Sequence, residues 1–211
     1  MLTNFCGSSA ASLTAISNGC LQIGEVRKLI FQRKYSSGTT LNELTIASAN
    51  PNLIASWTPL LTAVNGTKAI VTPFEIDNPV FEPGQVYEEG GPGETAGGIP
   101  KFVGFGPGKF TCKVTARVSK TIEELRKLYG EDLTVHLING FGRIIMSADA
   151  NSSPTKARGI DIKELKVSGR QGDAINTRGF NTLEFYLPDG WDNVLYEVTP
   201  SDFNALTGLA N

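Results

Sequence analysis

The chain has 211 residues, of which 40% are hydrophobic and 19% charged, so it has enough apolar material for a packed core and is not a disordered chain. A formal net charge of −2 excludes binding to nucleic acid through bulk positive charge. No run of residues approaches the roughly 20 apolar positions of a membrane-spanning helix, so no membrane association is expected. Twenty-three Gly and eleven Pro predict many turns and short strands.

The first 20 residues are mostly Ser, Ala, Thr and Gly, and we interpret 1–20 as an N-terminal arm ahead of a single β-rich domain over 21–211. Three cysteines, Cys6, Cys20 and Cys112, are an odd number without metal-like spacing. This favours reduced thiols in a cytosolic product, and a Cys6–Cys20 bridge that ties down the arm is the alternative.

A strand is predicted over 26–33, and a hairpin over 61–71, where LTAV and KAIV flank Asn65-Gly66-Thr67. The strongest strand is predicted over 109–119, because apolar residues from Phe110 to Val118 alternate with polar ones. Cys112 falls on the apolar face of this strand and is therefore interpreted as a core thiol.

Between these strands lies a Gly/Pro-rich loop, 78–108, with nine Gly and five Pro in 31 residues. A pure linker would lack the apolar side chains found here, and a structureless loop of this length is uncommon in a compact domain. We predict an extended, hairpin-like arm whose hydrophobic residues contact a surface outside the monomer.

One α-helix is predicted over 121–129, with Thr121 and Glu124 as a capping box and Gly130 as its C-terminal cap. Strands over 133–138 and 143–148 follow, joined by a hairpin turn at 139–142. The apolar phase of 160–167 slips, which predicts a bulge near Lys163–Glu164. Strands over 182–187 and 194–198 flank a turn, and one helical turn is expected after Pro200. The fold class is mainly β: an antiparallel sandwich or barrel with one flanking helix.

Charge is segregated along the chain. From 69 to 100 there are six acids and no base, and from 101 to 130 seven bases stand against two acids. This pattern suits head-to-tail contacts between identical copies, and an ordinary solvated surface explains it equally well.

No catalytic, metal or cofactor site is predicted. His136 is the only histidine, so a Ser/His/Asp or Cys/His mechanism would have to use it, and we interpret it as a structural or surface residue. The sequence GFGPG at 104–108 lacks the spacing of a phosphate loop. Glu88, Glu89 and Glu94 lie in the Gly-rich loop, which would not hold them in the geometry of a glycosidase, and the spacing of a calcium loop is absent.

The order of elements resembles bacteriophage tail tube proteins, the major tail protein family. The resemblance rests on WTPLLTAVNGTKAIVTPFEIDNPVFEPG, a Gly-rich loop, a strand, a T-x-x-E-L-x-x-L helix and a hairpin, followed by GIDIKELKVSGRQGD and FYLPDGW. It covers roughly 20–198 and implies a virion protein, made in the host cytoplasm, that forms hexameric rings stacked into a tube through which DNA passes without specific binding.

The resemblance implies that the 78–108 loop reaches a neighbouring copy. We select as interface candidates the aromatic and charged residues of the loop and the following strand: Phe81, Tyr87, Phe102, Phe105, Glu88, Glu89, Lys109, Lys113 and Arg117. An acidic lumen would repel DNA phosphates, and Glu75, Asp77 and Glu184 are its candidates.

Two alternatives remain open. The first is another phage structural protein, such as a head decoration, neck or collar protein. The second is a carbohydrate-binding or adhesion module, in which Trp57, Trp191 and surface Tyr residues would stack on sugar rings.

Overall fold

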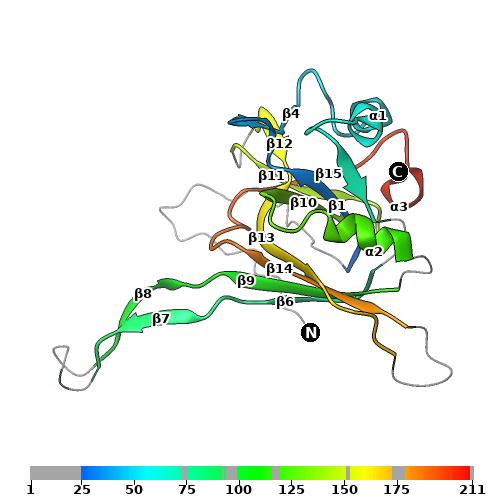
Figure 1. The fold of residues 1–211 in the computed structure, drawn as a ribbon. Helices are drawn as coiled ribbons and strands as arrows, with labels where there is room; N and C mark the ends of the chain where they lie inside the picture. The colour runs from blue at the N-terminus through cyan, green and yellow to red at the C-terminus, as the bar shows by residue number, and fades with distance from the viewer. Residues whose placement is uncertain are drawn as a thin grey trace.

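The computed structural model describes residues 25–72, 76–91, 93, 99–115, 119–150, 153–172 and 179–209, with backbone only at 119–121. The 1–20 arm with Cys6 and Cys20 lies outside this range. The described residues form fifteen strands and three short helices (Figure 1). None of these helices is long and apolar enough to cross a membrane.

The strands carry the labels used in Figure 1. Their bounds are β1 Val26–Arg33, β2 Tyr35–Ser37, β3 Thr40–Leu41, β4 Leu44–Thr45, β5 Ala69–Val71, β6 Ile76–Glu82, β7 Val86–Glu89, β8 Lys101–Phe105, β9 Gly108–Val114, β10 Leu133–Asn139, β11 Ile144–Ala148, β12 Lys156–Arg158, β13 Ile160–Val167, β14 Asn181–Leu187 and β15 Leu195–Val198. The helices are α1 Ile54–Thr62, α2 Ser119–Arg126 and α3 Ala205–Gly208.

Eleven strands are linked into one antiparallel network that folds into two layers at β13. Residues Ile160–Ile162 of β13 pair with β10, and Lys163–Val167 pair with β14. The bulge predicted near Lys163–Glu164 is confirmed at the point where the strand changes layers, and Glu164 adopts a φ of 51° there. We call β1, β4, β5, β10, β11, β12 and β15 the upper layer, and β6, β9 and β14 the lower layer (Figure 1). The predicted β class is confirmed, and the described strands form a sandwich and no closed barrel.

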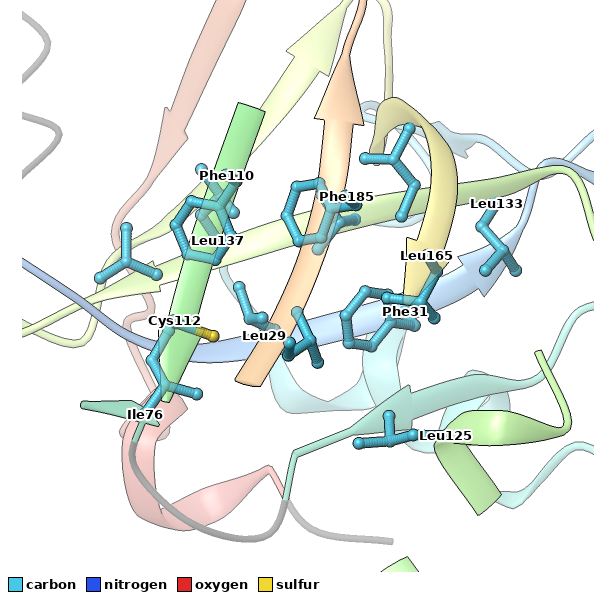
Figure 2. Close-up of a cluster of buried hydrophobic side chains, with 14 of the residues drawn as sticks. Leu29, Phe31, Ile76, Phe110, Cys112, Leu125, Leu133, Leu137, Leu165 and Phe185 are labelled. Atoms are coloured by element: carbon cyan, nitrogen blue, oxygen red, sulfur yellow. The ribbon is translucent and has the colours of Figure 1, made fainter. Parts of the chain in front are cut away.

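The main core fills the space between the two layers. Phe31 of β1 meets Phe185 of β14 edge-on with ring centroids 6.2 Å apart, and Phe110 of β9 stacks on Phe185 at 4.8 Å. Figure 2 shows these rings between strands of the two layers that cross one another. Cys112 is buried in the same cluster, as predicted, and burial raises the pKa of its thiol to about 12. Leu125 of α2 closes one side of the core.

The upper layer is also buried on its outer face, where α1 and α3 cover a second apolar cluster. Trp57 of α1 is fully buried, and its indole nitrogen donates a hydrogen bond of 2.9 Å to the Pro51 carbonyl. Ala205 and Leu209, in and just after α3, are fully buried in the same cluster. This double coverage explains why all seven residues of β10 are buried.

Two sequence predictions of local structure are wrong. The predicted hairpin over 61–71 does not form, because 54–62 is helix α1 and β5 pairs with β1 instead. Helix α2 begins at Ser119, so Thr121 is not its N-cap and lies within the first turn. The strand predicted over 109–119 is confirmed for 109–114 and wrong at Ser119, which belongs to α2, and 116–118 lie outside the described residues. The hairpin at 139–142 and the helical turn after Pro200 are confirmed.

Candidate interaction surface

Within the described part of the chain, the most exposed element is the β-hairpin formed by β7 and β8, and we call the described residues between 83 and 107 the arm. Residues 78–82 of the predicted loop instead belong to β6, which pairs with β9. The arm projects away from the two-layer body at the end of β6 and β9 (Figure 1). The Gly106 amide donates a hydrogen bond of 2.7 Å to the Gln85 carbonyl, and a side chain added at Gly84 would overlap the Gly106 carbonyl. The two chain segments are therefore in close contact at the base of the arm. The contact between Gly84 and Gly106 sets the direction in which the arm projects.

Three apolar side chains form a strip along one face of the arm. Val86 lies opposite Phe105 in the strand register, and the rings of Phe105 and Phe102 are 5.0 Å apart. Each of the three is about half exposed, at 53% for Val86, 52% for Phe105 and 54% for Phe102. Tyr87, Ile99 and Val103 add further exposed apolar area to the arm. A contiguous apolar surface on a projecting hairpin is typical of a site that contacts another molecule.

A groove of about 800 Å³ begins where the strip meets the body, and we call it the root groove. Phe81 and Trp191 line it, and their rings stack with centroids 5.5 Å apart. Phe81 also meets the core residue Phe110 edge-on at 4.8 Å. Of the predicted aromatic candidates, Phe81 therefore joins the arm to the core, whereas Tyr87, Phe102 and Phe105 face solvent.

The root groove carries an acidic margin. Glu82, Asp189 and Asp192 line it and are exposed. None of these three carboxylates forms an ion pair with the described part of the chain. The groove thus combines aromatic rings with the unpaired carboxylates of Asp189 and Asp192, whereas Glu82 lies opposite Lys109.

Part of the predicted charge segregation is compensated inside the monomer, between β6 and β9. The acidic and basic stretches become neighbouring antiparallel strands, in which Glu82 lies opposite Lys109 and Asp77 opposite Lys113. Lys109 also forms an ion pair of 2.8 Å with Glu184, and Lys113 lies 4.6 Å from the Phe180 ring centre. These contacts need no second copy.

The charged residues of the arm itself remain available. Glu88 and Glu89 are exposed, and lie opposite Phe102 and Lys101.

Of the lumen candidates, Asp77 and Glu184 share the outward face of the lower layer with Lys109 and Lys113. Glu75 and Arg117 lie outside the described residues.

His136 is buried beneath α1, with its ring edge-on to Trp57 at a centroid distance of 5.3 Å. Neither ring nitrogen has a hydrogen-bond partner among the described residues. Burial lowers the pKa of His136 to about 3, so the ring is neutral and structural at pH 7. Trp57 is fully buried and so cannot stack on a sugar ring. The predicted alternative of a platform in which Trp57 and Trp191 both bind sugar is therefore wrong.

Sequence reasoning missed two features of this surface. One is the contribution of the 187–193 turn to the root groove, for which the DGW sequence at 189–191 was the available signal. The other is Phe141, which is 74% exposed at the turn between β10 and β11. The sequence feature that could have indicated its exposure is an aromatic residue between two glycines in a predicted turn.

No family model and no curated protein matches the chain. Among solved structures, the chain is similar to one from an assembly described as the tail of an empty GTA particle, with C6 symmetry, which is among the chains that match. The two are 14% identical, and the match covers 57% of this chain and 80% of the other, with a TM-score of 0.33. A likeness at that score does not establish a shared fold.

Proposed function

We propose that this protein is a structural component of a phage tail, whose copies associate into hexameric rings that stack into a tube for DNA passage. The observation that carries the proposal is the arm, because a closed hairpin presents half-exposed Val86, Phe102 and Phe105 away from the body. An isolated copy leaves this strip in water, whereas a neighbouring copy would bury it.

The fold supports repeated self-association in a second way. Strand β6 ends the strand order of the lower layer and pairs only with β9 among the described strands, so it offers a free edge to a neighbour. Pairing such edges within a ring would remove them as sites of aggregation. The order of elements also resembles tail tube proteins, which is the source of the hexameric number and of DNA passage in this proposal.

The proposal is tested with the purified full chain. We expect rings and tubes in negative-stain images at high concentration, and large species in sedimentation velocity runs. The variant Phe102→Ser/Phe105→Ser should fold with an unchanged circular dichroism spectrum and stay monomeric, because it removes two aromatic rings from the strip. Single rings that never stack would instead favour a decoration, neck or collar protein.

A matched control separates the strip from general surface hydrophobicity. Val64 is 99% exposed and lies outside the arm, so Val64→Ser removes an exposed apolar side chain without touching the strip. We expect Val64→Ser to assemble like the unchanged protein. A wild-type chain that stays monomeric at every concentration, or a double variant that assembles normally, would contradict the proposal.

A further inference from the structure

We propose that the root groove of one copy receives the Phe141 hairpin, residues 139–143, of a second copy, in a head-to-tail contact. This inference rests on the proposed self-association and names the surfaces that meet. It joins two features that the monomer leaves unexplained: an exposed phenyl ring on a fixed turn, and an aromatic groove with unpaired acids.

The Phe141 hairpin is held in one conformation before any partner binds. The buried Asn139 side chain accepts hydrogen bonds from the amides of Phe141 and Arg143, both at 3.0 Å. The Gly140 amide bonds to the Glu25 carbonyl at 2.8 Å, and Gly142 adopts a φ of 75° that favours glycine. A fixed turn that presents a 74% exposed Phe loses little conformational entropy on binding, and aromatic residues dominate interface energetics.

The groove fits this hairpin in chemistry. Phe81 and Trp191 offer aromatic surface to the ring, and a volume of about 800 Å³ leaves room for the turn around it. Arg143 uses Nη1 to pair with Glu197, and the other donors of its guanidinium make no hydrogen bond within the described residues. A guanidinium has five donors, so Arg143 can keep Glu197 and still bind Asp189 or Asp192 of the second copy.

The end of a neighbouring arm fits the groove less well. Lys101 is the only basic residue between 76 and 108, and it lies opposite Glu89 in the hairpin, next to Glu88. Bringing these two carboxylates to a groove lined by Glu82, Asp189 and Asp192 would place like charges together. The charges therefore favour the Phe141 hairpin.

Cross-linking between two proteins that each carry one exposed cysteine tests the contact. Gly140 and Asp192 are exposed, and a Cβ at Gly140 meets only ordinary contacts, at 3.7 Å and beyond. Both variants, Gly140→Cys and Asp192→Cys, are made with Cys6→Ser and Cys20→Ser. Cys112 stays, because it is buried. We expect a short bismaleimide to give covalent dimers when the two proteins are mixed and assembled, and few dimers with either alone.

Two further mixtures identify the occupant. Val64→Cys mixed with Asp192→Cys reports random collision and should give no dimer above background. Lys101→Cys mixed with Asp192→Cys tests the arm end, and dimers there instead of with Gly140→Cys would overturn the proposal.

A second variant measures the energetic role of the ring. Phe141→Ser should melt at the same temperature as the unchanged chain, since the ring is exposed, but should need a tenfold or higher concentration to assemble. Assembly at the unchanged concentration, together with no Gly140–Asp192 dimers, would refute this contact while leaving the proposed function standing. Failure of the unchanged chain to assemble would refute the proposed function instead.

Discussion

His136 gives the molecule a pH dependence that can be worked out from one side chain. Its pKa is about 3 in the folded protein and near 6.5 in the unfolded chain, because burial disfavours the charged ring. Stability from the neutral ring is complete above pH 6.5 and is lost as the pH falls toward 3. We expect a loss of roughly 2 kcal/mol in the free energy of unfolding between pH 7.5 and pH 5, measured by urea denaturation.

The control is His136→Phe, which keeps an aromatic ring against Trp57 and cannot titrate. Its free energy of unfolding should change little over the same pH range. Glu131, whose pKa is lowered by its hydrogen bond from Arg33, acts in a separate window below its ordinary value of 4.5. Equal pH dependence in both proteins would show that His136 is not the responsible group.

The burial of His136 also shows what single residues in the sequence could reveal. Alternation placed His136 on the face opposite Val135 and Leu137, which is correct. It could not show that this face is covered, because the cover comes from α1 and α3, far away in the chain. Local pattern thus predicted the direction of the side chain but not its environment.

At the scale of elements, the direction of the arm depends on its glycine contact. A Cβ at Gly84 would overlap the backbone of Gly106, so Gly84→Ala must shift one strand of the arm. We expect Gly84→Ala to leave the urea midpoint of the body nearly unchanged and to abolish assembly in negative-stain images. The reason is that the shift redirects Val86 and Phe105 without disturbing the two cores.

Gly104 provides the matched control within the same hairpin. A Cβ there meets nothing within 4 Å, and its φ is not in the left-handed region, so Gly104→Ala should assemble normally. Should both alanine variants assemble equally well, the direction of the arm would be irrelevant to association.

Elements were predictable where their own residues decide the structure. The bulge in β13 and the turn at 139–142 both follow from local periodicity and turn chemistry. Helix α1 was missed because Pro59 lies inside it and the following Asn65-Gly66-Thr67 resembles a hairpin turn. Its helical structure comes from packing Trp57 against β10, which is a long-range contact. The root groove was missed for the same reason, since the 187–193 turn meets the arm only in the folded protein.

At the scale of the whole molecule, the upper layer needs cover on both faces, and α3 provides part of the outer cover. The Lys28 ammonium, 5% exposed, donates hydrogen bonds of 2.8 Å to the carbonyls of Leu206 and Leu209. Ending the chain at Asn204 removes these two acceptors of the Lys28 ammonium and also removes the fully buried Ala205 and Leu209. We expect a loss of roughly 3–5 kcal/mol in the free energy of unfolding, measured with urea.

A chain that ends at Leu209 is the control, because it keeps both carbonyls and the buried leucine. It should unfold at the same urea concentration as the full chain. The chain ending at Asn204 should unfold at a lower urea concentration and should bind a fluorescent apolar dye, because its outer apolar cluster is uncovered. Equal urea midpoints for the two truncations would mean that α3 lies outside the cooperative unit. Packing of α1 alone would then be sufficient to stabilise the outer face of the upper layer, and α3 would contribute nothing to the free energy of unfolding of the body that carries the arm.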